Sequence, residues 1–187
     1  MKNSNQSFII LINPLEPCAR MHLDQILRQP LRYSYFSGPD VVRSWHDAQQ
    51  RGVNCAALVH ILGKEFLGVE LPWELMGFEL IYDQCYLRDL QEETPQKGDI
   101  LIVGRGIKLD KWEREYRETG RLRIEKHPRV HLAMHTGQFA TVGDPFLIHA
   151  TPYDGGGIRL WPLSYLTSHP FYSHIYKWRR IHEHHTS

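Results

Sequence analysis

A cysteine at the start of a helical stretch, followed by two histidines on apolar segments, is the part of this sequence best suited to chemistry. Cys55 follows Asn54, a residue type that often caps the first turn of a helix. His131 and His149 each lie in a short apolar run that is typical of a strand. A thiol nucleophile needs a base that takes its proton and a group that orients the base. The pattern therefore predicts a thiol nucleophile with two histidine partners.

The expected position of Cys55 gives its thiol a physical reason to react. An unperturbed thiol has a pKa of about 8.5 and is mostly protonated at neutral pH. The unpaired N–H groups and the positive dipole end at a helix N-terminus favour the thiolate. However, Cys55 also lies on the apolar stripe with Val59 and Leu62. Because cysteine is among the most buried residue types, core packing is the commoner explanation of such a residue taken alone.

The two histidines favour a reactive role for Cys55 over simple core packing. Along residues 129–135, His131 points away from the bulkier side chains, and His149 does the same along residues 146–151. If the two strands pair, the imidazoles come into contact. His135 shares the face of His131 but lies about 13 Å along the strand, so one cysteine cannot reach both.

The elements that must position these residues change type along the chain. After a short buried strand at residues 8–12, helices are expected at 21–29, at 40–51 with Asp40 or the preceding turn as its cap, from Cys55 to a break at Gly68, and at 71–82. Strands then follow at residues 100–103, 129–135, 146–151, 157–161 and 171–181. This order predicts an α+β fold in which an antiparallel sheet packs on the helix that begins at Cys55.

Length and charge narrow the class of protein. The 187 residues show no repeat or composition break, which indicates one domain over 1–187 with a charged insertion at 106–127. Within that insertion Leu109, Trp112 and Tyr116 recur at helical spacing, so we expect a surface helix or flap. The balance of 22 basic and 21 acidic residues gives no reason to expect a nucleic acid or an anionic membrane as partner.

Targeting signals and metal-binding patterns are missing from the printed sequence. No apolar run approaches the roughly 20 residues that span a bilayer, and the run at 8–12 lacks the features of a signal peptide. We therefore expect a cytoplasmic protein, with export by a non-classical route left open. The three cysteines, Cys18, Cys55 and Cys85, are expected as reduced thiols. The histidine-rich end lacks the paired spacing of a structural zinc site, so no metal or cofactor is expected.

Four short motifs, in this order, resemble the NlpC-like cysteine peptidases, bacterial enzymes of papain fold that cut cell-wall peptides. The resemblance extends from about residue 33 to residue 180. The motifs are Asn54-Cys55-Ala56-Ala57-Leu58-Val59, Gly98-Asp99-Ile100-Leu101, His131-Leu132-Ala133-Met134 and Leu147-Ile148-His149-Ala150.

The resemblance implies a role for each candidate residue. Cys55 would be the nucleophile, His131 the general base, and His149 the residue that holds His131 in its working tautomer. The backbone N–H of Cys55 would stabilise the oxyanion. A tyrosine upstream of the cysteine often lines the family's site, and Tyr33 or Tyr35 would take that place.

The residues on either side of Cys55 differ from the family's pattern. The family usually has Asp-Cys-Ser-Gly, where the Asp and Ser help to recognise a free amine of the substrate. Here Asn54 and Ala56 occupy those substrate-binding positions. The expected substrate is therefore an amide bond in a small peptide or muropeptide-like fragment that differs from the family's usual one.

Two other functions stay open from the sequence. The first is a catalytically silent binding module on the same fold, which the changes at Asn54 and Ala56 favour. The second is an acyltransferase that uses the same three residues and passes the acyl group to an amine or alcohol. Acyltransferase relatives usually have the histidine before the cysteine, and this chain has the reverse order.

Overall fold

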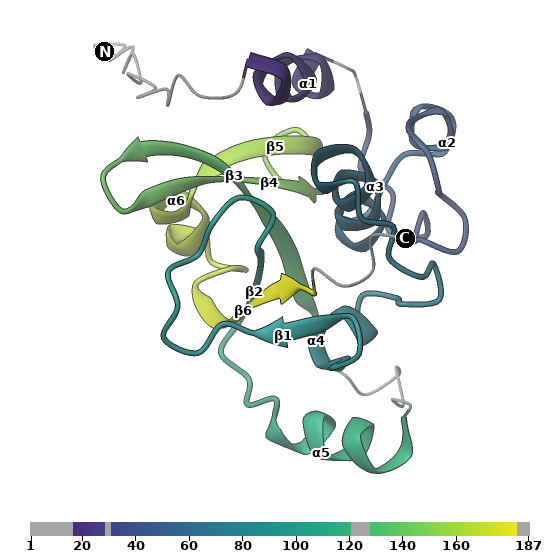
Figure 1. Ribbon diagram of the computed structural model, residues 1–187, viewed down its shortest axis with the longest axis vertical. Helices are drawn as coiled ribbons and strands as arrows, with labels where there is room; N and C mark the ends of the chain where they lie inside the picture. The colour runs from purple at the N-terminus through teal and green to yellow at the C-terminus, as the bar shows by residue number, and fades with distance from the viewer. Residues whose placement is uncertain (1–16, 29–30, 121–127, 183–187) are drawn as a thin grey trace.

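The computed structural model describes residues 17–28, 31–120 and 128–182. A single sheet has helices on both of its faces (Figure 1). The strand expected at residues 8–12 and the end of the chain from residue 183 lie outside the described residues, as do the side chains of residues 17–22, including that of Cys18.

The sheet has six strands, and every neighbouring pair is antiparallel, in the order β1-β6-β2-β3-β4-β5. The strands are β1 (Leu87–Asp89), β2 (Ile100–Gly104), β3 (Val130–Thr141), β4 (Asp144–Thr151), β5 (Gly157–Pro162) and β6 (His174–Ile181). The predicted α+β fold with an antiparallel sheet is confirmed. The last strand begins at His174 rather than at residue 171, because residues 169–172 form a turn in which the N–H of Tyr172 bonds the carbonyl of His169.

The helices are α1 (Pro17–Arg28), α2 (Trp45–Arg51), α3 (Cys55–Leu67), α4 (Glu79–Tyr82), α5 (Asp110–Thr119) and α6 (Leu163–Ser168). The predicted start and end of α3 are confirmed. The side chain of Asn54 accepts a hydrogen bond of 2.9 Å from the N–H of Ala57, and Gly68 ends the helix with φ 66°. Within the described ranges, no helix is long and apolar enough to cross a membrane.

Two helix predictions were wrong in extent. The helix expected from Asp40 begins only at Trp45, because Ser44 supplies the cap and accepts from the N–H of Asp47. The helix expected over 71–82 is limited to α4, and two short turns separated by irregular residues precede it. There the carbonyl of Leu75 is bonded at 2.7 Å by the ring of His60 on α3 and is not part of a helical ladder.

The sheet is buried on both faces. On one face, Leu58 and Leu62 of α3 belong to the same apolar cluster as Leu132 and Ile148. On the other face, a smaller apolar cluster is formed by Leu101, Val103, Ala133, Leu147, Trp161, Leu166 and Tyr172. This explains the unbroken apolar run at residues 100–103, which is fully buried in β2 as the sequence indicated.

The charged insertion contains the expected helix. Figure 1 shows α5 at the far end of the molecule from α1. Trp112 and Tyr116 pack against the larger apolar cluster, and the ring of Tyr116 lies 5.8 Å from that of Tyr82 on α4. Residues 121–127 of the predicted insertion lie outside the described residues.

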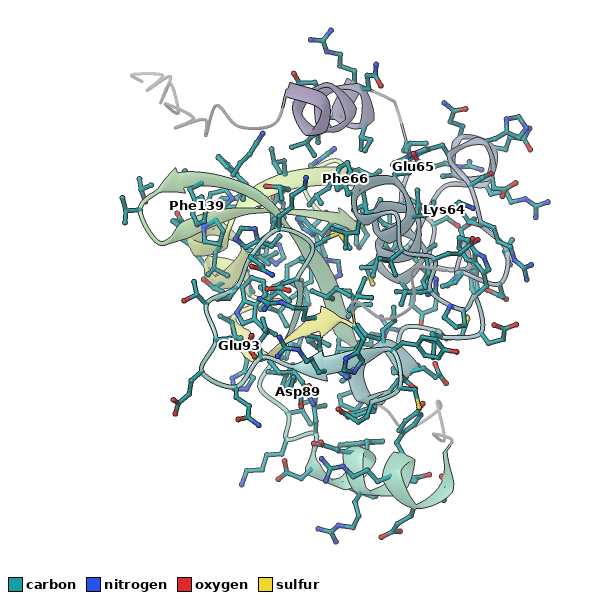
Figure 2. The ribbon with its side chains drawn as sticks, viewed as in Figure 1. Lys64, Glu65, Phe66, Asp89, Glu93 and Phe139 are labelled. Atoms are coloured by element: carbon teal, nitrogen blue, oxygen red, sulfur yellow. The ribbon has the colours of Figure 1, made fainter. Side chains whose placement is uncertain are left out.

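Arg179 of β6 is fully buried and joins the sheet to α4 and to the segment that follows it. Its Nε lies 2.9 Å from the carboxylate of Asp89, a residue of β1 that Figure 2 labels. Its two terminal nitrogens donate to four carbonyl oxygens, those of Leu80, Ile81, Asp83 and Leu87. A planar guanidinium satisfies such a ring of acceptors, whereas an ammonium has too few donors.

Replacing this guanidinium should destabilise the fold. Arg179→Lys is expected to lower the free energy of unfolding by about 3 kcal/mol, because buried carbonyl oxygens lose their partners. Urea denaturation measures the difference. The control is Arg117→Lys, which alters an exposed pair with Glu113 and should cost less than about 0.5 kcal/mol. Equal effects of the two substitutions would contradict the proposed role of Arg179.

Candidate active site

Cys55 is the first residue of α3, and its half-buried thiol lies against β3. The backbone N–H groups of Leu132, of Ala56 and of Cys55 itself lie close enough to the sulfur to favour its thiolate. β3 pairs with β4 from Met134, opposite Ile148, toward the hairpin. The sulfur therefore lies by Leu132, beyond this paired part of the two strands.

His131 and His149 are in direct contact, as the sequence predicted. Nε2 of His131 lies 2.8 Å from Nδ1 of His149, with the rings nearly perpendicular at 82°. Both side chains project from the face of the sheet opposite to the α3 core, and both are buried. His131 is also the residue next to Leu132, whose backbone N–H lies near the thiol.

The bond between the histidines leaves one nitrogen of the His131 ring unused. Within the described part of the chain, Nδ1 of His131 has no hydrogen-bond partner. Nδ1 is the ring nitrogen nearer the backbone of β3. If Nε2–H of His131 donates to His149, then Nδ1 carries the lone pair that accepts a proton.

The same assignment places a proton on Nε2 of His149. That nitrogen is buried and has no hydrogen-bond partner among the described residues. The ring of Trp161 lies 4.5 Å from the imidazole at 62°. An N–H that faces an aromatic ring gains a weak interaction, which offsets part of the cost of burial.

Burial favours the neutral forms of the Cys55 thiol and of the His131 and His149 imidazoles. It raises the pKa of the Cys55 thiol, and the surrounding backbone amides offset only part of that shift. Burial lowers the pKa of His131 to about 3 and that of His149 well below its ordinary value. At pH 7 the site therefore holds a neutral thiol and two neutral imidazoles, with no thiolate–imidazolium pair.

Tyr172 is a residue of this site that the sequence reasoning missed. Its ring stacks on His131 at 4.3 Å and 23°, and its hydroxyl lies 2.8 Å from Oγ1 of Thr151. Burial raises the pKa of this hydroxyl, and the nearby Cys55 raises it further. Tyr172 lies in the turn before β6, inside a segment expected to be strand, and no local pattern marks it.

Tyr33 is the predicted tyrosine that the structure brings to Cys55. The segment around it pairs with Val53, since Ser34 N–H bonds the carbonyl of Val53 at 3.1 Å. Burial raises the pKa of the Tyr33 hydroxyl, and the proximity of Cys55 adds to the shift. Tyr35 is different, because 60% of its side chain is exposed and its ring packs edge-on against Phe36.

Asn54 and Ala56 both contribute to the fold at the start of α3. The amide of Asn54 is used at both ends, since Oδ1 caps α3 and Nδ2 donates to the carbonyl of Tyr35 at 3.2 Å. The methyl group of Ala56 is buried in the larger apolar cluster. The two residues at which this chain differs from the NlpC-like pattern thus help to form the start of α3.

Two further observations show what does not belong to the site. Nδ1 of His135 accepts from the N–H of Gly137 at 2.8 Å, so this histidine belongs to a turn of β3 away from Cys55. Among the described residues, no group of three His, Cys, Asp or Glu side chains is arranged to hold a metal ion.

Comparisons of this chain with protein-family models, with curated proteins and with solved structures found no match. The function of the site is therefore argued from the geometry of Cys55, His131 and His149.

Removing the stacked ring should change the titration of His131. Tyr172→Leu is expected to admit water to the imidazole and to raise its pKa from about 3 toward the ordinary value near 6.5. Tyr172→Phe keeps the ring, so the pKa should stay low. NMR titration of the His131 ring protons measures both variants. The same titration in Tyr172→Leu and in the unchanged protein would contradict this role of the ring.

The buried histidines should make the fold sensitive to acid. The folded-state pKa of His131 is about 3 and its unfolded value about 6.5. Between these values the unfolded chain binds more protons, so stability is full above pH 6.5 and falls as the pH drops toward 3. At pH 5 the loss for His131 is about 2 kcal/mol.

Urea denaturation at pH 7 and pH 5 tests this expectation. His131→Asn removes the titrating group and should make the free energy of unfolding less dependent on pH. His174→Gln, which changes an exposed histidine, should keep the dependence of the unchanged protein. An equal pH dependence in all three proteins would contradict the assignment.

Proposed function

We propose that this protein is a thiol hydrolase of papain-like, NlpC-type fold that cleaves an amide bond through an acyl-enzyme. The observation that carries the proposal is that the Cys55 thiol lies against the backbone of Leu132, the residue next to His131, whose ring is bonded to that of His149. A helix that begins with the cysteine and packs on an antiparallel sheet bearing the histidines supports the proposed fold.

The first half of the reaction is acyl transfer to Cys55. As Sγ attacks the carbonyl carbon, Nδ1 of His131 takes the thiol proton. The resulting imidazolium is stabilised by His149, whose Nδ1 accepts from Nε2–H. His131 then passes its proton to the departing amine, the C–N bond breaks, and a thioester remains on Cys55.

The second half is hydrolysis. His131 takes a proton from water, the hydroxide adds to the thioester carbonyl, and the thiol leaves with that proton. The free acid and the starting enzyme result, so no cofactor is required by the reaction. The backbone N–H of Cys55 and the neutral hydroxyl of Tyr33 lie near the sulfur and would donate to the oxyanion.

The proposed substrate is a small peptide or a peptidoglycan-derived peptide. Because Asn54 is engaged in capping and Ala56 is buried, neither supplies the carboxylate or hydroxyl that the family uses to bind a free amine. We therefore place substrate recognition on other residues.

Alkylation by iodoacetamide tests the nucleophile without a known substrate. Thiolate content makes the rate of an ordinary thiol fall about tenfold per pH unit below its pKa. His131 stays unprotonated to low pH and can assist as a base. The alkylation rate of Cys55 should therefore fall much less between pH 8 and pH 5 than the rate of an ordinary thiol. Mass spectrometry of the modified peptides gives the rates of Cys55 and of the exposed Cys85 in one sample.

General bases usually accelerate a reaction by about a hundredfold or more. The variant His131→Ala should therefore slow alkylation of Cys55 at pH 6 by at least about tenfold. The rate of Cys85 should not change. If Cys55 reacts no faster than Cys85 at pH 6 and His131→Ala alters nothing, the hydrolase proposal is wrong and a silent binding module is the better account.

A further inference from the structure

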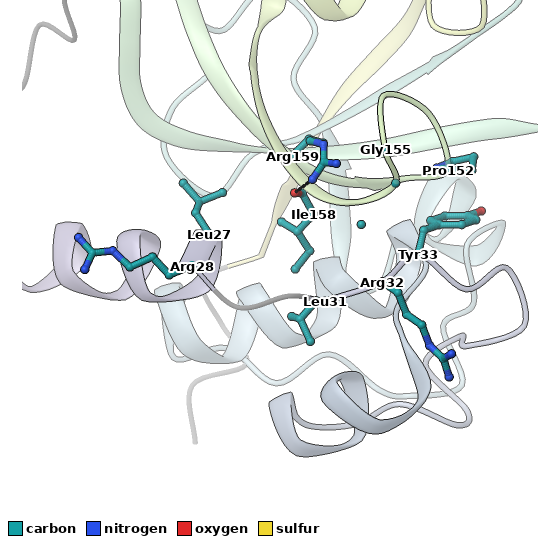
Figure 3. A pocket seen from close by; sticks show the side chains of 11 residues that line it. Leu27, Arg28, Leu31, Arg32, Tyr33, Pro152, Gly155, Ile158 and Arg159 are labelled. Carbon is teal, nitrogen blue, oxygen red and sulfur yellow. Dashed lines mark hydrogen bonds between the residues drawn. The ribbon is translucent and has the colours of Figure 1, made fainter.

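A groove of about 630 Å³ lies between the end of α1, the segment before Tyr33 and β5, within the usual size range of ligand pockets (Figure 3). Apolar side chains from these three parts of the chain line it, including Leu27, Leu31 and Ile158. Tyr33 lines it as well, and this is the tyrosine whose hydroxyl pKa is raised by the nearby Cys55. Tyr33 is therefore the residue that the groove shares with the candidate site.

The wall of the groove is rigidly built at Gly157. This residue has φ 82°, and a Cβ atom there would lie 2.2 Å from the carbonyl oxygen of Leu31. Only glycine fits such a contact, which brings the segment before Tyr33 directly onto β5. Substrate entering along this wall would meet a preformed surface.

The charged residues of the lining are all arginines. Figure 3 shows Arg28 on α1, Arg32 before Tyr33, and Arg159 on β5, and the lining includes no Asp or Glu. Arg129 adds a fourth positive charge near the hydroxyl of Tyr33. Among the described residues, none of the four forms an ion pair with a carboxylate.

Arg159 is held in place without being neutralised. Its guanidinium donates to the carbonyl of Asp154 at 2.8 and 3.2 Å and to that of Ile158 at 3.0 Å. The nearby carboxylate of Asp154 accepts instead from the hydroxyl of Tyr165 at 3.1 Å. A fixed guanidinium with donors to spare is well suited to a carboxylate ligand.

We infer that the groove binds the carboxylate-bearing part of the substrate, with Arg159 and Arg129 as its principal charge partners. This inference rests on the proposed thiol chemistry and adds a substrate class to it, namely an acidic peptide. The apolar groups of that peptide lie over Leu31 and Ile158, and its scissile carbonyl reaches Cys55 past Tyr33.

Two alkylating agents of equal size and different charge test the inference. Iodoacetate carries the carboxylate and iodoacetamide does not. Relative to N-acetylcysteine amide at low salt, Cys55 should favour iodoacetate over iodoacetamide by about fivefold. This preference should shrink in 0.5 M salt, because screening weakens the attraction.

His131 also attracts iodoacetate once it has taken the thiol proton. Arginine variants separate this contribution to the preference from that of the groove. The ratio of the two rate constants should fall about threefold in Arg159→Gln and further when Arg129→Gln is added. The control is Arg114→Gln, which removes an equal charge from α5 and should leave the ratio unchanged.

The outcomes distinguish the two proposals. If Cys55 reacts with both reagents at the ratio of the small thiol, or if the two groove variants leave the ratio unchanged, the carboxylate site is wrong while the nucleophile stands. If Cys55 reacts with neither reagent while Cys85 reacts with both, the nucleophile is wrong and the groove inference fails with it.

Discussion

The contact between the first turn of α3 and the edge of β3 is the interaction on which the candidate site depends. Asn54 caps the helix that begins at Cys55, and the sulfur lies near the backbone N–H of Leu132. Backbone N–H groups near the sulfur favour the thiolate and offset part of the effect of burial on the thiol pKa. Helix capping and sheet pairing together set where the sulfur lies.

Burial on both faces of the sheet has an electrostatic consequence. The apolar cluster that contains Tyr172 and Trp161 surrounds the two imidazoles and removes them from water. A charged imidazole is unfavourable there, so both stay neutral, and their mutual hydrogen bond couples the tautomer of one ring to that of the other. The packing that stabilises the fold therefore also keeps an unprotonated imidazole at neutral pH.

Arginines serve two different ends in this molecule. Arg179 is buried and satisfies a ring of carbonyl oxygens with Asp89 beside it, so its charge is compensated within the fold. Arg159 also bonds carbonyl oxygens but has no carboxylate partner in the described ranges, and it borders an open groove. The same type of side chain thus supports the fold in one place and leaves an uncompensated charge at the surface of a groove in another.

Much of the local structure was predictable from the sequence, since caps, apolar periodicity and turn residues act over a few residues. Asn54, Gly68 and the apolar runs of β2 to β5 predicted α3 and most of the sheet, and the alternation along β3 and β4 predicted that His131 and His149 meet. Tyr172, the turns before α4 and the arginine-lined groove depend on contacts between residues far apart in the chain. No local pattern encodes such contacts, so only the tertiary structure decided them.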